Sequence, residues 1–219
     1  MSLRYGTKVL VVGTLVAALA VAGTACSGDD SSGAAADPAA SSAPPACPES
    51  SRAHWQKLAN EIRASVYCPT WFPRPLGGKF SGRFFNGRSV DPDHSYLVSW
   101  AWFESGGGIV QEVHVNLRGY PGSARIPTCE DTLTVAGKTV RKKLPCFSDN
   151  LGQKEIRGKT VSVYTANQGA DMWHVLYAWR SGGSLYTISQ HVAPPYTVEQ
   201  VIGHLDRMTS TLVRLQPRA

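Results

Sequence analysis

The sequence lacks the short motifs that build most catalytic and cofactor sites. It contains no G-x-S-x-G, H-E-x-x-H, G-x-G-x-x-G or G-x-x-x-x-G-K-S/T segment, and each of these motifs places particular groups where a reaction or a phosphate requires them. Its 5 cysteines form no C-x-x-C pair and no Cys/His group at zinc spacing. The missing motifs exclude the sites that they build, and we expect no cofactor and no metal site.

The sequence also has no apolar run of membrane-spanning length. Its most apolar segment, Val9–Ala22, has 14 residues, short of the roughly 20 that a spanning helix needs. Arg4 and Lys8 precede it, which is the order of charged and apolar regions in an export signal. We therefore interpret residues 1–25 as a signal peptide, with an uncleaved anchor as the alternative.

Three small residues, Gly23, Thr24 and Ala25, stand directly before Cys26. This pattern resembles the lipobox of bacterial lipoproteins, in which the cysteine thiol receives a diacylglyceryl group and becomes the first residue of the mature chain. The resemblance implies an exported protein that lipid on Cys26 anchors to the outer face of the cell membrane. Cleavage after Ala25 without lipidation, which would leave a free exported protein, is the alternative.

Without Cys26, the cysteines form an even set: Cys47, Cys68, Cys129 and Cys146. An even set in an oxidising compartment favours two disulfides. Cys129 and Cys146 stand 17 residues apart across β-like sequence, so we predict that they pair, and Cys47 with Cys68 follows by elimination. That second bridge requires the chain to fold back, because the intervening helix would span about 22 Å at 1.5 Å per residue.

Composition divides the rest of the chain into a tether and a domain. Residues 26–46 are rich in Ser, Ala, Gly, Asp and Pro, without an aromatic or large aliphatic residue, so we expect a disordered tether. Residues 47–219 are long enough for a single domain with a real core. The whole chain has 22 basic and 16 acidic residues, of which 20 and 13 lie from Cys47 onward. The domain therefore has a net charge of +7.

Apolar periodicity predicts an α+β fold. Helical spacing predicts helices at Arg52–Val66, capped by Ser51, and at Val198–Val213, where Thr197 and Gln200 form a capping box. Alternation predicts strands at Lys79–Arg88, Tyr96–Glu104, Ile109–Leu117, Thr160–Ala166, Asp171–Arg180 and Ser184–Val192. We therefore predict a curved antiparallel β-sheet of about six strands with an N-terminal and a C-terminal helix packed on it. Whether the strand tryptophans form core or line a groove stays open.

Three polar residues are the candidate catalytic group. Glu112 and His114 face the same side of one predicted strand, and His174 lies in the middle of another. If these strands were close together, the three side chains could converge as an acid–base or metal-binding group. An ordinary polar sheet face is the alternative.

Basic residues concentrate between Lys138 and Lys159. They attract anions through a long-range, salt-sensitive field, and the partner would be anionic envelope polymer or lipid head groups. Lysines on an exposed edge strand also prevent pairing with other chains, which is the structural alternative. No nucleic-acid recognition motif accompanies the charge, so we expect no nucleic acid as a partner. The candidate anion-binding residues are Arg141, Lys142, Lys143, Lys154, Arg157 and Lys159.

The arrangement of signal, tether and one small cysteine-bearing domain resembles surface lipoproteins of actinobacteria that have no assigned function. The domain shares their general style in Cys-Pro-Thr-Trp-Phe-Pro from Cys68 and Val-Asn-Leu-Arg-Gly-Tyr-Pro-Gly from Val115. We predict a membrane-anchored binding or interaction module of the cell envelope. A cell-envelope hydrolase that uses Glu112, His114 and His174 is one alternative, and a structural accessory subunit of an envelope complex is another.

Overall fold

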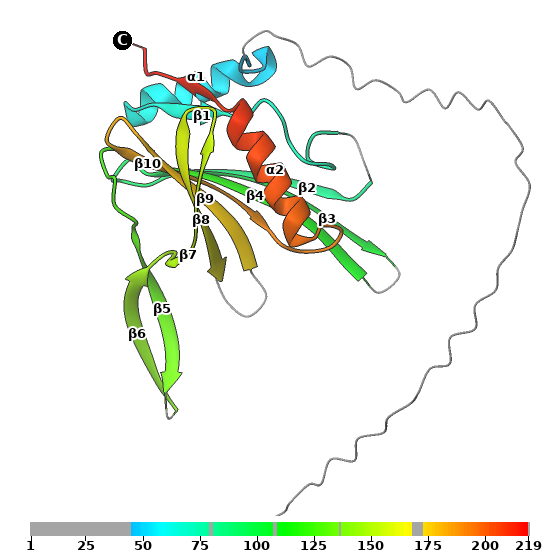
Figure 1. The fold of residues 1–219 in the computed structure, drawn as a ribbon, viewed down its shortest axis with the longest axis vertical. Helices are drawn as coiled ribbons and strands as arrows, with labels where there is room; N and C mark the ends of the chain where they lie inside the picture. The colour runs from blue at the N-terminus through cyan, green and yellow to red at the C-terminus, as the bar shows by residue number, and fades with distance from the viewer. Residues whose placement is uncertain (1–44, 79–80, 107–108, 136, 168–172, 219) are drawn as a thin grey trace, which may run out of the picture. The chain divides into compact units, whose positions relative to one another are not determined.

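The structure is a computed structural model that describes residues 45–78, 81–106, 109–135, 137–167 and 173–218. The predicted signal peptide, Cys26 and the predicted tether up to residue 44 lie outside the described residues. All described residues belong to one compact unit, which combines two helices with antiparallel strands (Figure 1). Among these residues, no helix has the length and apolar character needed to cross a membrane.

A seven-stranded antiparallel sheet forms the centre of the unit, in the order β2-β3-β4-β10-β9-β8-β7. Gly182 and Gly183 both take positive φ angles between β9 and β10, as a two-residue hairpin turn requires. The strands are β2 (Arg83–Val90), β3 (Tyr96–Gly106), β4 (Ile109–Tyr120), β7 (Asp149–Ile156), β8 (Lys159–Asn167), β9 (Trp173–Ser181) and β10 (Ser184–His191).

One face of this sheet carries the main core. Strand alternation directs Val113, Val115 and Leu117 of β4 to this face, where all three are fully buried. The adjacent strands contribute Ile188 of β10 and Tyr177 of β9 to the same core. Trp102 and Trp179 are buried, Trp71 and Trp100 are half-buried against the main core, and Trp173 is exposed, so the tryptophans do not share one role.

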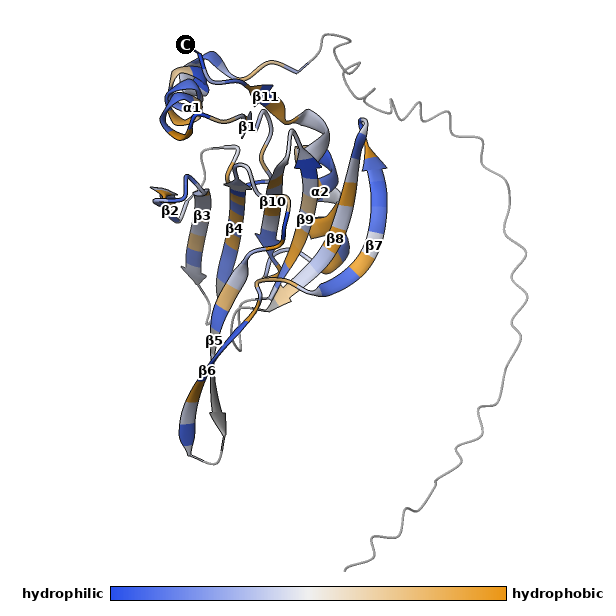
Figure 2. Cartoon of the chain, turned by 90° about the vertical axis from the view of Figure 1, so that its left-hand side faces the viewer, coloured by the Kyte–Doolittle hydropathy of each residue, from blue (hydrophilic) through white to orange (hydrophobic). Residues whose placement is uncertain are grey.

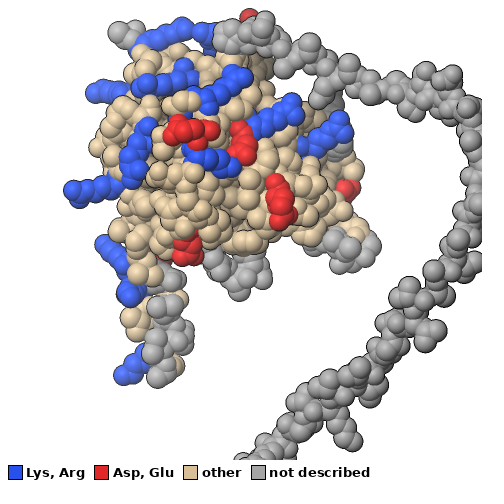
Figure 3. Space-filling model, viewed as in Figure 1, with Lys and Arg blue, Asp and Glu red and all other residues tan. Residues whose placement is uncertain are grey.

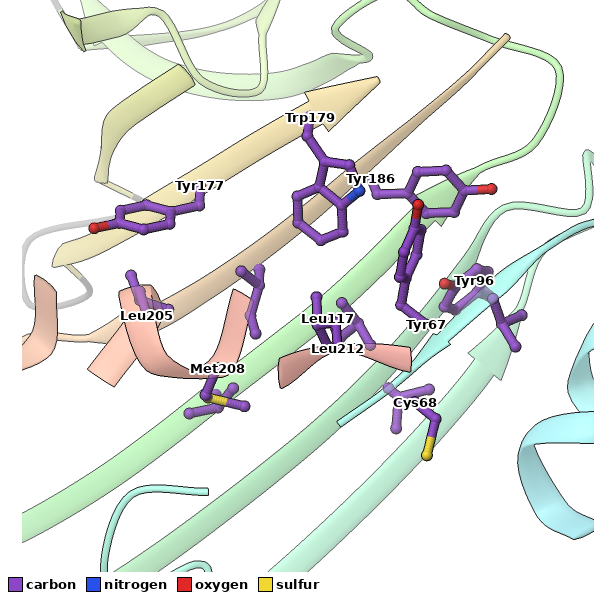
Figure 4. Packing of buried hydrophobic residues seen from close by; sticks show 14 of the residues in the cluster. Tyr67, Cys68, Tyr96, Leu117, Tyr177, Trp179, Tyr186, Leu205, Met208 and Leu212 are labelled. Atoms are coloured by element: carbon purple, nitrogen blue, oxygen red, sulfur yellow. The ribbon is translucent and has the colours of Figure 1, made fainter. Parts of the chain in front are cut away.

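Helix α2 (Val198–Thr211) covers the core face, with Leu205 and Met208 fully buried against the sheet (Figure 4). Its predicted capping box is present. The Thr197 hydroxyl accepts from the backbone N–H of Gln200, and the Gln200 side chain accepts from the backbone N–H of Thr197. Farther along the helix, the Tyr177 hydroxyl lies 2.8 Å from the Asp206 carboxylate. The helix is therefore fixed at its start and along its length.

Helix α1 (Glu49–Ile62) lies beside a small sheet of β1 (Val66–Cys68) and β11 (Val213–Leu215). It reaches the large sheet through Trp55, whose ring lies 6.2 Å from that of Trp100. The predicted bounds and the predicted Ser51 cap were wrong: the N-cap is Pro48, and Arg63 ends the helix in the left-handed conformation. Val66, which was predicted to be helical, is instead the first residue of β1.

The hairpin of β5 (Thr128–Val135) and β6 (Lys138–Pro145) forms a separate two-stranded sheet. It projects beyond the large sheet in both ribbon views (Figures 1 and 2). The Cys129–Cys146 disulfide closes its base, and Cys47–Cys68 joins the start of α1 to β1. These are the two pairings expected from the sequence.

The predicted number of strands was wrong. The described part of the chain has eleven strands in three sheets, rather than about six in one. Periodicity missed β1 and β11 because each has only three residues. It missed β5, β6 and β7 because they carry many polar and charged residues, and because β6 and β7 bury few side chains.

The two disulfides are expected to contribute differently to stability. Cys47 and Cys68 are 5% and 0% exposed, so Cys47→Ser/Cys68→Ser should lower the free energy of unfolding by about 2–4 kcal/mol. Cys129→Ser/Cys146→Ser should mainly release the β5–β6 hairpin, because a two-stranded hairpin alone is marginally stable. Thermal unfolding and amide hydrogen exchange would distinguish these effects. An equal fall in Tm for both variants, with β5 and β6 still protected, would contradict this prediction.

Candidate functional site

The face of the large sheet opposite α2 is rich in polar side chains. Because side chains alternate along a strand, the residues that flank the buried valines of β4 all point to this second face. β10 adds alternate residues from its own sequence, and the register places Thr187 opposite Arg118 and Ser189 opposite Asn116. The polar members are Glu112, His114, Asn116 and Arg118 of β4 and Thr187, Ser189 and His191 of β10.

Three histidines from three neighbouring strands form a row on this face, here called the histidine row: His114, His174 and His191. His174 and His191 are register partners with stacked rings whose centroids lie 5.2 Å apart. The centroid of the His114 ring lies 5.5 Å from that of His174. The structure therefore brings the predicted His114 and His174 together, and it adds His191, which the sequence analysis did not single out.

Glu112 lies at one end of the histidine row. Its Oε1 atom is 3.4 Å from His114 Nδ1 and 3.3 Å from His191 Nδ1. His114 Nε2 is 3.1 Å from both the Ser99 hydroxyl and the Asn116 side-chain oxygen. These contacts hold the His114 ring between a carboxylate on one side and two neutral polar groups on the other.

His174 is the most deeply buried member of the row, with 3% exposure. Neither of its ring nitrogens has a hydrogen-bond partner. Burial, which is the largest cause, and the nearby His114, His191 and Arg118 together lower its pKa to about 3. Burial also lowers the pKa of His114, although Glu112 opposes this effect. His114 and His174 are therefore neutral at pH 7.

The proximity of these groups does not create a ready metal site. No set of three His, Cys, Asp or Glu side chains within the described ranges is placed to hold a metal ion. His114, which its lowered pKa keeps neutral, is in reach of both a carboxylate and a hydroxyl. Acid–base chemistry is therefore the reactivity that this geometry permits.

A cleft of about 760 Å³ opens on the same face of the sheet, beside the base of the β5–β6 hairpin. We call it the hairpin cleft. Its volume falls within the range of small-molecule sites, about 300–1,000 Å³. Two parts of the chain line the cleft. The large sheet contributes Arg118 and Tyr120 of β4, Thr187 of β10, Leu176 of β9, and Thr165 and Ala166 of β8. The hairpin and the residues after it contribute Cys129, Glu130, Leu144, Pro145, Cys146, Phe147, Ser148 and Asp149.

Arg118 gives the hairpin cleft its one positive charge. The side chain is half-buried, and none of the four ion pairs among the described residues includes it. Its field reaches neighbouring groups: burial raises the pKa of Tyr120 and the Arg118 guanidinium opposes that rise. Arg118 was not among the residues predicted from the sequence, although the alternation that places Glu112 and His114 on one face continues through Asn116 to Arg118.

The candidate anion-binding residues separate into two groups. Arg141, Lys142 and Lys143 lie on β6, where all three are exposed on the projecting hairpin (Figure 3). The second group lies at the turn between β7 and β8, where it packs against α2: Lys154 Nζ lies 2.6 Å from the Asp206 carboxylate, and Lys159 Nζ lies 3.4 Å from the Thr209 carbonyl. Arg157, at the same turn, is exposed, so both Arg157 and the β6 group are presented to solvent.

No protein-family model, curated protein or solved structure matches the chain.

The low pKa of His174 is expected to make folding sensitive to acid. The pKa is about 3 in the folded protein against an ordinary value of 6.5, so the unfolded chain binds more protons between these values. The free energy of unfolding should fall as the pH is lowered through this window, by up to about 1.4 kcal/mol per pH unit. His174→Phe should remove this contribution and flatten the slope.

Urea unfolding between pH 7 and pH 4 measures that slope. The exposed His54 on α1 provides a matched control, and His54→Phe should leave the slope unchanged. A His174→Phe slope equal to that of the wild type would show that His174 does not resist protonation in the folded protein.

Proposed function

We propose that the protein is a membrane-anchored binding module of the cell envelope that receives a small ligand in the hairpin cleft. The observation that carries this proposal is the cleft itself, about 760 Å³ between a sheet face and a disulfide-closed hairpin. Its lining combines the apolar Leu176, Ala166 and Phe147 with the charged Arg118. Small-molecule sites are concave and combine apolar side chains with polar groups that orient the ligand, and this cleft offers both kinds of side chain.

The hydrolase alternative would use Glu112, His114 and His174. The structure brings these side chains into one row, but none of the three lines the hairpin cleft. A binding role uses the cleft as it stands, whereas a hydrolase would need its substrate over the row, where His174 is 3% exposed. We therefore favour binding over hydrolysis.

The membrane anchor in this proposal is lipid on Cys26. Its support is the run of small residues before Cys26 and the even set of cysteines that remains, all four of which form disulfides in the described unit. Disulfides are typical of proteins that fold in an oxidising compartment. Export with an N-terminal lipid would leave the unit outside the cytoplasmic membrane, where the exposed cations of β6 would meet anionic envelope polymer or lipid head groups.

Lipidation has a direct test in the intact mass of the protein extracted from membranes. The expected mass is that of the chain from Cys26 plus a diacylglyceryl group and any further acyl chain. Cys26→Ser should lose both this added mass and retention in the membrane fraction, while Cys47→Ser should keep the lipid. An unmodified Cys26 thiol in the membrane-extracted protein would refute the anchor.

Filling the hairpin cleft is expected to abolish ligand binding. Leu144 lines the cleft, whereas Leu151, on the neighbouring strand β7, is 62% exposed and does not. Leu144→Trp should therefore narrow the cleft. Leu151→Trp is the control, because it adds the same side-chain volume at a position that faces solvent. The Cys26→Ser chain would be incubated with envelope lipid extract, repurified and examined by native mass spectrometry.

We expect a retained small molecule on the parent chain and on Leu151→Trp, and its loss from Leu144→Trp. Thermal unfolding checks that both variants are folded. Retention by Leu144→Trp at the parent level, or no retained molecule on any chain, would count against the cleft as the binding site.

A further inference from the structure

We propose that Arg118 binds the anionic head of an amphiphilic monocarboxylate whose apolar chain lies along the hairpin cleft. This inference rests on the proposed function and names the ligand class of the same site. Arg118 lies on β4, at one end of the cleft, and the apolar residues of the floor lie on β9 and β8. The cleft therefore combines one cation on β4 with an apolar floor on β9 and β8, and Ser148, Asp149 and Thr165 add polar groups beside that floor.

The charge of Arg118 calls for an anion. A guanidinium stays protonated at any pH at which the protein is folded. Arg118 shares a hydrogen bond with the neutral Tyr120 hydroxyl, and this contact does not neutralise its half-buried charge. Glu112 is the one acid in the described part of β4 that shares its face, and it is six residues away, about 20 Å along a strand. A carboxylate matches the planar donor fork of arginine in a bidentate arrangement.

The acids of the cleft lie at its rim. Glu130 and Asp149 both line the opening and both are exposed, so water and salt screen them. Glu130 is also the register partner of Lys143 on β6. Arg118 is half-buried on the sheet, where a charge acts through a lower effective dielectric. A negatively charged head group therefore gains the most favourable electrostatic energy in the cleft.

The apolar floor sets the other half of the ligand. Leu176 and Ala166 belong to a small apolar cluster with Phe147, which is 4% exposed. From β4 to β8 the sheet crosses β10 and β9, three strand spacings or about 14 Å. A medium-length alkyl chain laid across the strands would cover this floor while its carboxylate meets Arg118. Each methylene that the floor covers leaves water, which strengthens binding.

The experiment compares three probes that share a ten-carbon chain: decanoate, decanol and decylamine. Binding to the Cys26→Ser chain is measured by displacement of a fluorescent fatty acid at pH 7.5. We expect decanoate to bind best. Arg118→Gln should weaken decanoate by about ten- to a hundredfold, the worth of a hydrogen bond to a charged group, and should leave decanol unchanged. Arg118→Lys keeps the positive charge, so it should lose less affinity for decanoate than Arg118→Gln.

Arg83→Gln is the matched control, since Arg83 is an exposed arginine on β2 and should not affect any probe. If decylamine binds better than decanoate, or if Arg118→Gln binds decanoate as tightly as the parent, the assignment of Arg118 is wrong. If decanol and decanoate bind equally well and Leu144→Trp binds neither, the cleft is a binding site for the apolar chain. That result would contradict the preference for an anionic head group. If no probe binds, the cleft itself fails as the site of an amphiphile.

Discussion

The burial of β10 on both faces is the constraint on which the rest of the structure depends. Every residue of this strand is buried, because β4 and β9 flank it in the sheet and other elements cover it above and below. Between Tyr186 and Ser189 its side chains alternate between large apolar residues and small polar ones. Tyr186 and Ile188 enter the main core, and Thr187, Ser189 and His191 enter the opposite face. Burial of polar groups is costly unless they find partners, so the second face must be organised by polar contacts.

This division gives the two faces different roles. The α2 face holds the large apolar cluster and fixes the fold (Figure 4). The second face holds a smaller apolar cluster, the histidine row and the hairpin cleft. His174 shows how far the second face departs from an optimal core, since both of its ring nitrogens are buried without partners. Buried polar groups without partners are rare in folded proteins, and a functional role is one reason for their presence.

Local patterns in the sequence predicted the parts of the fold in which one face of an element is buried. The alternation in β4 correctly separated Val113, Val115 and Leu117 from Glu112, His114 and Asn116, and the Thr197–Gln200 capping box marked the start of α2. Strand order could not be predicted in this way, because β4 meets β10 only through pairing between residues about 70 positions apart. His191 was missed for this reason: it enters the site through its neighbours on other strands. The β5–β6 hairpin was missed because its exposed, charged residues carry no burial signal.

The ends of the compact unit differ in what they present. The described chain enters beside α1, and the β5–β6 hairpin projects from the opposite end (Figure 1). A unit held by its N-terminal side would therefore have a proximal pole, made of α1 and the β1–β11 sheet, and a distal pole, made of the hairpin. The cations of β6 belong to the distal pole. In that orientation they would reach away from the surface that holds the chain, toward polymer in the surrounding wall, and the head groups beneath would face α1.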